Sequence, residues 1–294
     1  MVQRINVGRR VFVAFNYTFL IGLSLLCLAP LIHILAVSFS SSWAASAGEV
    51  TFWPVDFTTS SYKFISNKPE FLQSMIVTLK RVALGLVINL FLTVLTAYPL
   101  SKETSSFKWR TLYVWIFVFT ILFGGGLIPW YMTVKQTGLL NTIWALVIPG
   151  AVPVFNIILL LNFFRGLPKE LEEAALIDGA GHWTILWRLF VPLSMPALAT
   201  ISLFTVVGHW NAWFDGMILM RSTSDYPLQT YLRSVIISQD FANLSSTSLS
   251  ELKEISDRTA KAAQIFLGAL PILLVYPFLQ RFFIKGIVLG SVKG

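Results

Sequence analysis

Residues 173–192, EAALIDGAGHWTILWRLFVP, form a partly polar stretch between two apolar runs, and the rest of the chain is arranged around them. Pro168 and three glutamates within the next five residues indicate a helix start, because carboxylates stabilise the positive end of a helix dipole. Gly179 follows Asp178 as a helix stop, and a second helical segment occupies residues 182–192. The stretch predicts two short helices joined by a tight turn. From spacing alone, an ordinary solvated loop explains it equally well.

The spacing also resembles the EAA loop in permease subunits of ATP-binding-cassette (ABC) importers. In that family Glu-Ala-Ala is followed by three residues, a glycine, nine residues and Ile-x-Leu-Pro. Small alanine side chains let a helix approach a partner surface closely, and a glycine permits a left-handed turn. The resemblance implies that this loop, within residues 165–192, docks into a groove on a cytosolic ATPase. The implied coupling residues are Glu173, Ala174, Ala175, Asp178 and Gly179.

Composition places the chain in a membrane. Of its 294 residues 55% are hydrophobic and 12% are charged, and the mean hydropathy is +0.72. Soluble domains are about 45–50% apolar and about 25% charged. The formal net charge of +8 does not indicate nucleic acid here, since basic residues beside apolar spans set membrane orientation. We therefore expect an all-α membrane protein.

Six apolar runs are long enough to cross a bilayer, which needs about 20 helical residues. The first is far longer than the roughly 7–15 apolar residues of a signal peptide, so we expect it to be retained. Glycines 124–126 with Pro129 interrupt the third run, and Pro271 and Pro277 are expected to break the sixth. The break in the third is either part of a translocation path or a helix end followed by a re-entrant link. The predicted spans are residues 11–37, 71–100, 111–132, 142–164, 191–220 and 263–283.

Charge asymmetry predicts the orientation of these spans. Six spans put both termini and the 165–192 loop on one side, where the short flanking segments carry twelve lysines and arginines against five acids. The opposite loops, apart from Lys80 and Arg81, carry eight lysines and arginines, against nine acids when Asp215 of the fifth span is counted, and they are mostly long. Short basic loops stay in the cytoplasm, so both termini and the loop are predicted to be cytoplasmic. The whole chain, 1–294, is predicted to be a single transmembrane permease domain.

Motifs for catalysis are missing from the sequence. It contains no G-x-x-x-x-G-K-[ST] phosphate loop, so the chain is not itself the ATPase. His33, His182 and His209 are far apart and lack metal-ligand spacing, and we interpret each as structural. We expect a non-catalytic permease without a metal site or cofactor of its own, with ATP and magnesium held by partner ATPase subunits.

Three further stretches extend the resemblance over nearly the whole chain, namely residues 208–215, 226–233 and 285–294. They resemble the carbohydrate-importer permeases of the maltose-transporter class, and within it the LplC/YtcP branch. Membership implies a multi-pass protein of the bacterial cytoplasmic (inner) membrane, paired with a second similar permease. It also implies two cytosolic P-loop ATPase subunits and an external solute-binding protein. The branch is associated with oligosaccharides, including acidic ones such as alginate.

Candidate substrate contacts lie in the fifth predicted span. Aromatic faces stack on sugar rings and amides bond hydroxyl groups, which selects Trp210, Asn211, Trp213 and Asp215. An acid inside a membrane span is a functional candidate by default. The competing interpretation places the two tryptophans in an aromatic belt at the membrane interface. In this class the partner permease can also carry most of the sugar contacts.

Lys80 and Arg81 interrupt the second span near its predicted outer end. A cation inside a bilayer must reach the headgroups, pair with an acid or face water. If the two residues face the substrate path, their positive charge favours acidic sugars. A secondary transporter or a membrane enzyme is the alternative class. A secondary transporter would need ionisable residues inside the membrane for ion coupling, and an enzyme would need a cluster of acids, bases or metal ligands. The predicted spans contain almost no ionisable residues beyond Lys80, Arg81 and Asp215.

Overall fold

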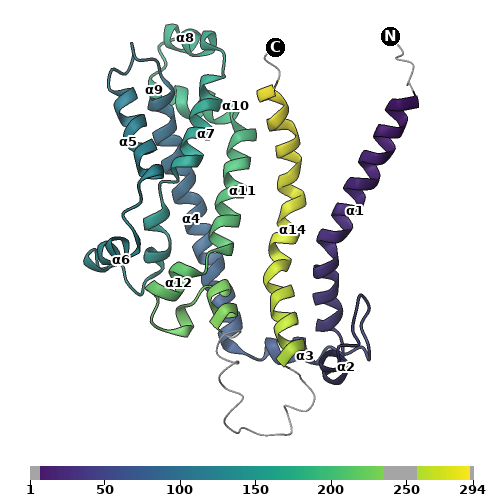
Figure 1. Cartoon of the computed structure of the whole chain (residues 1–294). Helices are drawn as coiled ribbons and strands as arrows, with labels where there is room; N and C mark the ends of the chain where they lie inside the picture. Colours follow the sequence, from purple (N-terminus) through teal and green to yellow (C-terminus); the bar gives the residue numbers. More distant parts are fainter. Residues whose placement is uncertain (1–6, 235–256, 292–294) are drawn as a thin grey trace. The chain divides into compact units, whose positions relative to one another are not determined.

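The computed structural model describes residues 7–234 and 257–291, and every regular element in these two ranges is helical (Figure 1). The first elements are α1 (Val7–Ser38), α2 (Ser42–Ala47), α3 (Ser60–Ser66), α4 (Pro69–Ser101), α5 (Arg110–Leu122), α6 (Leu127–Gln136), η1 (Ile143–Leu146), η2 (Ile148–Gly150) and α7 (Val154–Arg165). They are followed by α8 (Lys169–Ile177), α9 (His182–Ile185), η3 (Leu186–Phe190), α10 (Val191–Leu193), α11 (Met195–Asn211), α12 (Phe214–Leu219), η4 (Thr223–Asp225) and α14 (Asp257–Ser291).

The described residues fall into two compact units. One comprises the chain up to Pro69 together with residues 257–270, and the other comprises Glu70–Ser234 and the described residues from Pro271 onward. A small cluster in the first unit joins the end of α1 to α2, with Ala36, Val37 and Ala45 among its buried side chains. The second unit contains the predicted coupling loop and the predicted substrate residues.

Two described helices are long and apolar enough to cross a membrane alone, Gly8–Ser38 and Pro69–Ser101. These helices cover residues 11–37 and 71–100, where the first two spans are predicted. Three further candidates are bent pairs, with angles of 115° between α5 and α6, 47° between the η1–η2 segment and α7, and 80° before α11. The first bend follows glycines 124–126, where the sequence predicts an interruption.

The structure corrects two predicted boundaries. Helix α14 runs continuously through Pro271 and Pro277, so the prediction that these prolines break the sixth span is wrong. Prolines are tolerated in such helices when neighbouring groups satisfy the freed backbone. Helix α11 begins at Met195, whereas the fifth span is predicted from residue 191, because the helical segment that starts at His182 continues to Leu193. Pro192 does not stop it, since it stands in the first turn of α10, and the 80° bend comes at Ser194 instead.

Helix α4 has an inward face that is more polar than its hydropathy suggests. The buried positions recur every three or four residues, which is the spacing of one helix face. Six of them are polar or small: Ser74, Thr78, Arg81, Gly85, Asn89 and Thr93. Beyond them the face becomes apolar and joins a core formed by α4, α7, α9, η3 and α11, in which Leu160, Ile185 and Ile201 are fully buried. Along α4 the second unit is therefore polar at one level and apolar at the next.

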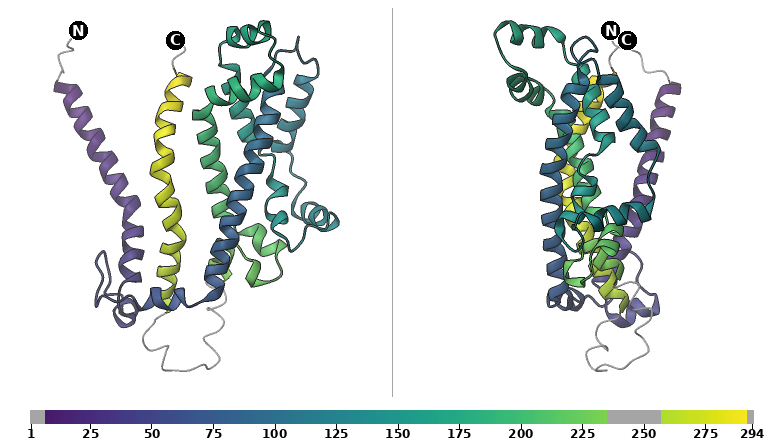
Figure 2. Two further views of the ribbon diagram at one scale, coloured as in Figure 1. Left: turned by 180° about the vertical axis from the view of Figure 1, so that it is seen from behind. Right: turned by 90° about the vertical axis from the view of Figure 1, so that its left-hand side faces the viewer.

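Helix α8 lies near the Ser101 end of α4, whereas α6 and α12 lie at a level closer to its Pro69 end (Figures 1 and 2). Arg81 is twenty residues from Ser101, which corresponds to about 30 Å of helix. The second unit thus carries two separate regions of interest, one at each level.

Candidate functional site

The turn after α8 has the geometry expected of a helix stop. Gly179 has a φ of +78°, in the left-handed region, and its amide donates to Leu176 O at 3.0 Å. The next amide, of Ala180, donates to Ala175 O at 2.9 Å. These two bonds cap the carbonyls at the end of α8. The predicted pair of short helices joined by a tight turn is confirmed, with α8 ending at Ile177 and α9 beginning at His182.

Most of the predicted coupling residues point away from the protein. Glu173, Ala174, Asp178 and Gly179 are exposed, whereas Ala175 is half-buried and packs against the core of α4, α7 and α11. Ile177 beside them is 85% exposed, although it is a large apolar residue.

Lys102 ties this loop to the end of α4. Its Nζ lies 2.5 Å from Glu172 Oε1, and it also lies over the rings of Tyr98 at 3.9 Å and Phe190 at 4.2 Å. Burial lowers the pKa of Lys102, and the bond with Glu172 opposes that change. Arg165 adds a bond to Leu100 O at 3.2 Å. The contact joins α8 to the end of α4. Sequence patterns alone did not identify Lys102 or Glu172 as anchors.

The second region consists of two adjoining cavities where broken helices meet. The first, which we call the aromatic pocket, has a volume of about 540 Å³. Its walls come from the α5–α6 break, from α6 and from the α11–α12 break. It is lined by Gly126, Leu127, Trp130, Gly208, Asn211, Ala212, Trp213, Phe214 and Asp215. Irregular backbone inside a membrane is tolerated where it lines a cavity. The pocket therefore accounts for the helix breaks that line it.

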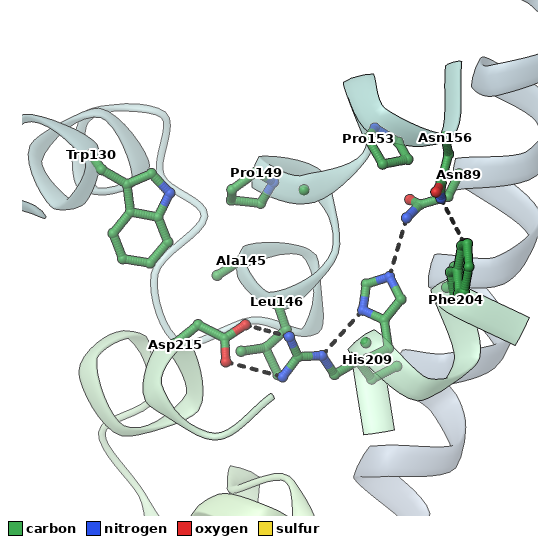
Figure 3. A pocket seen from close by; sticks show the side chains of 14 residues that line it. Asn89, Trp130, Ala145, Leu146, Pro149, Pro153, Asn156, Phe204, His209 and Asp215 are labelled. Atoms are coloured by element: carbon green, nitrogen blue, oxygen red, sulfur yellow. Dashed lines mark hydrogen bonds and ion pairs between the residues drawn. The ribbon is translucent and has the colours of Figure 1, made fainter. Parts of the chain in front are cut away.

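The second cavity, the amide chamber, has a volume of about 430 Å³ and shares Trp130, Gly208 and Asp215 with the aromatic pocket (Figure 3). The turn of η2 and the start of α7 form one wall, and the polar groups come from α4, α7, α11 and α12. It is lined by Arg81, Asn89, Trp130, Ala145, Leu146, Pro149, Gly150, Pro153, Asn156, Phe204, Thr205, Gly208, His209 and Asp215.

An ion pair closes one side of the chamber. The guanidinium of Arg81 forms a fork with the carboxylate of Asp215, with Nη1 3.1 Å from Oδ1 and Nη2 bonded to Oδ2. Nη1 also donates to Ala212 O at 3.4 Å, at the point where α11 ends. Arg81 is 3% exposed, so its charge is neutralised inside the protein and does not reach the headgroups. It therefore holds α12 and the α11–α12 break against α4.

The remaining bonds of this network run through His209. Nε of Arg81 lies 3.4 Å from Nδ1 of His209, and Nε2 of the same ring lies 3.4 Å from the Asn89 amide. The ring rests on Gly85, where any Cβ would collide with it. Asn156 donates to Thr205 Oγ1 at 3.5 Å on the adjacent wall. The chamber is thus a connected set of buried polar side chains in an otherwise apolar span.

The structure brings together some predicted substrate residues and separates others. Asn211, Trp213 and Asp215 line the aromatic pocket, and Arg81 reaches it through Asp215. Trp210 is buried on another side of α11, where it lines a small apolar cavity. The side chain of Lys80 is exposed, and neither cavity includes it.

Sequence reasoning did not select Trp130, Asn89, Asn156 or Thr205, and it interpreted His209 as structural. The signal was present for Asn89, because polar residues recur at helical spacing along α4 within an apolar run. Trp130 gave no such signal, since an aromatic residue beside a proline is common in any span. Among the described residues no group of three or more His, Cys, Asp or Glu side chains is arranged to hold a metal ion.

Broken apolar helices around polar cavities, together with an exposed helical loop, are the features of a membrane transport protein. Residues 109–288 match the family described as the binding-protein-dependent transport system inner membrane component. The chain belongs to this family, and is therefore a non-catalytic membrane permease subunit of an ABC transport system.

Relatives over the full length agree with this assignment. Protein LplC of Bacillus subtilis is 40% identical over 97% of this chain and 96% of its own. The polygalacturonan/rhamnogalacturonan transport system permease protein YtcP of the same organism is 36% identical over 97% and 99%. A crystal structure of a bacterial ABC transporter that imports the acidic polysaccharide alginate contains a chain with 34% identity and a TM-score of 0.86, matched over 95% of this chain and 98% of that one.

Proposed function

We propose that this chain is the membrane subunit through which an ABC importer takes up an oligosaccharide, and that the sugar passes along the aromatic pocket and the amide chamber. The observation that carries this proposal is the meeting of helix breaks from separate spans around Trp130, Asn211, Trp213 and Asp215. Binding sites of membrane transporters are commonly built from such discontinuous helices. The two indoles and the Asn211 amide have the chemistry that sugar rings and hydroxyls require.

The complete importer contains a second permease, two cytosolic P-loop ATPase subunits and an external solute-binding protein, in the bacterial cytoplasmic membrane. Six spans, with the 165–192 loop and both termini in the cytoplasm, put α8 within reach of the ATPases. ATP and magnesium reside on those subunits, and this chain has no cofactor of its own. The excess of lysine and arginine in the short loops supports the orientation.

Transport in this proposal depends on rigid attachment of the 165–192 loop to the ATPase dimer. When ATP closes the ATPase dimer, Glu173, Ala174, Ala175, Asp178 and Gly179 remain docked on it and α8 moves as a body. The Lys102–Glu172 contact transmits this motion to α4, and the polar face of α4 borders the amide chamber. A helix that contacts both regions lets closure in the cytoplasm switch the cavities from one side of the membrane to the other.

We propose an acidic sugar as the substrate, because the matched crystal structure is of an importer of the acidic polysaccharide alginate and YtcP is named for polygalacturonan and rhamnogalacturonan. Arg81 does not supply the positive charge for such a sugar, since Asp215 occupies its fork. Lys80 is exposed at the next position and is the cation that we assign to steering.

Uptake into lipid vesicles containing the full importer tests this function. Sugar import should require both ATP and the solute-binding protein, and an oligogalacturonate should enter faster than a neutral oligosaccharide of equal length. Lys80→Gln should reduce uptake of the acidic sugar about two- to fivefold, less at high salt, while Lys63→Gln in α3 serves as the matched loss of an exposed lysine. Import driven by an ion gradient without ATPase subunits would establish the secondary-transporter alternative instead.

A further inference from the structure

A third cavity lies where the end of α4 meets the coupling loop, and we call it the arginine cavity. It has a volume of about 540 Å³ and shares no lining residue with the aromatic pocket or the amide chamber. It lies where the spans predicted to end at residues 100 and 164 do end, which is the level of lipid headgroups. It is lined by Ser101, Lys102, Glu103, Ser106, Arg110, Phe164, Arg165, Leu167, Pro168, Lys169, Glu172, Glu173, Leu176 and Phe190.

Two of the four cations of this cavity are neutralised by acids of the same cavity. Lys102 Nζ lies 2.5 Å from Glu172 Oε1, and Lys169 forms an ion pair with Glu103. These four charges cancel in pairs. The charged groups that remain are Arg110, Arg165 and Glu173.

The two arginines are not neutralised by the described protein. No carboxylate of the described residues forms an ion pair with Arg110 or Arg165. Each donates only to a backbone carbonyl, Arg110 Nη1 to Lys102 O at 3.1 Å and Arg165 Nη2 to Leu100 O at 3.2 Å. Arg110 is half-buried, and its Nε is buried without a hydrogen-bond partner. The cavity therefore presents positive charge that these residues leave unpaired.

The two guanidinium groups also act on each other. The charged neighbour with a resolved effect on Arg165 is Arg110, and two like charges repel. Glu173 is exposed, and its resolved effect falls on Lys169 rather than on either arginine. An anion between the arginines would replace a repulsion by two attractions.

We propose that the arginine cavity binds the phosphate group of an anionic membrane lipid between Arg110 and Arg165. A guanidinium presents a planar fork of donors that matches the oxygens of a phosphate. Basic pockets between membrane helices bind anionic headgroups in this way. The lipid is a second ligand, distinct from the transported solute, and its binding does not depend on which solute that is.

The apolar part of the cavity favours a lipid over free phosphate. Five of the lining residues are apolar, and two of them, Phe164 and Phe190, are buried members of the apolar core. Inorganic phosphate gains nothing from such walls, because it is hydrated on every side. A phospholipid carries glycerol and acyl groups next to its phosphate, and burying these against apolar walls is favourable.

A bound lipid would tie together helices that meet beside the coupling loop. Arg110 is the first residue of α5, and Arg165 is the last residue of α7. The contact of Lys102 with Glu172, which joins α4 to α8, lies in the same cavity. One phosphate bridging the two arginines therefore links α5 to α7 at the base from which α8 projects.

Native mass spectrometry of the assembled importer, released from membranes of mixed phosphatidylglycerol and phosphatidylcholine, tests this site. The wild type should retain phosphatidylglycerol in preference to phosphatidylcholine, whose headgroup carries no net charge. Arg110→Gln and Arg165→Gln should each raise the half-saturating fraction of phosphatidylglycerol about fivefold. Lys108→Gln removes an exposed cation of the same segment outside the cavity, so it measures the general surface attraction and should have a clearly smaller effect.

Added inorganic phosphate distinguishes the two sources of the anion. It should leave the retained phosphatidylglycerol in place, and displacement by phosphate would overturn the assignment to a lipid. Equal retention of the two lipids by the wild type would overturn the proposal, whatever the variants do. Arginine variants that both match Lys108→Gln would overturn it as well, because the binding would then be surface attraction alone.

Discussion

The coupling loop and the amide chamber belong to one compact unit but place their polar residues in opposite environments. In the loop, Glu173, Ala174 and Asp178 are exposed. In the chamber, Arg81 and Asn89 are buried and most of their partners belong to the same chain. The loop is therefore specified by a local pattern, whereas the chamber exists only when α4, α7, α11 and α12 are assembled.

This difference predicts different consequences of mutation. A change in the loop should leave the protein folded and disturb its response to the ATPase. A change in the chamber should disturb folding first, because removing one member of a buried polar set leaves the others without partners.

The largest effect is expected for Arg81→Met. It leaves the Asp215 carboxylate without its cation, which destabilises proteins by about 3–5 kcal/mol when the site is buried. The double variant Arg81→Met with Asp215→Leu removes both charges and should recover most of that loss. Thermal unfolding of the purified protein in detergent measures both, with Lys80→Met as the control at an adjacent exposed position. A double variant as unstable as the single one would mean that the Arg81 bonds to His209 and Ala212 matter more than the charge pair.

An intermediate effect is expected at the turn of the loop. Gly179 has a φ of +78°, which a β-branched residue adopts only at a cost of about 1–2 kcal/mol, whereas Gly181 has a φ of −74° and open space around it. Gly179→Val should lower sugar uptake about tenfold while the protein remains inserted in the membrane. Gly181→Val, two residues away, should stay within twofold of the wild type. Equal uptake by the two variants would show that the left-handed turn is not required for coupling.

The smallest effect is expected for the exposed pair of Glu103 and Lys169, which joins the 101–110 segment to α8. Lys169 holds the pKa of Glu103 below its ordinary value of 4.5, and Glu103 raises the pKa of Lys169 above 10.5. The carboxylate contribution is complete above pH 4.5 and is lost as pH falls through the lowered pKa. The lysine contribution is complete below pH 10.5 and is lost above the raised pKa.

Glu103→Gln should therefore shift the unfolding temperature slightly at pH 7 and not at all below the lowered pKa of Glu103. Salt should reduce even the shift at pH 7, because both side chains are exposed and solvent screens the pair. A shift that persists in strong acid would point to a packing role for the Glu103 side chain.

The amino-acid sequence by itself determined the class of the protein and the geometry of the loop. Composition and apolar run length required a helical membrane protein, and the glycine after α8 required a left-handed turn, since both depend only on residues close together in the chain. Breaks were predicted correctly at glycines 124–126 but wrongly at Pro271 and Pro277. The local rule that proline stops a helix does not hold where neighbouring groups satisfy the backbone.

Tertiary structure alone decided which polar residues meet. Arg81 and Asp215 are 134 positions apart, and Asn89 and His209 are 120 apart, so no local pattern pairs them. The same reason explains why Trp210 and Trp213, three residues apart, lie in different surroundings. The α11–α12 break lies between them, and Trp210 packs into an apolar cavity while Trp213 lines the aromatic pocket. Sequence supplies the polar side chains, but only the packing of distant helices brings them together as an ion pair and a buried hydrogen-bond network.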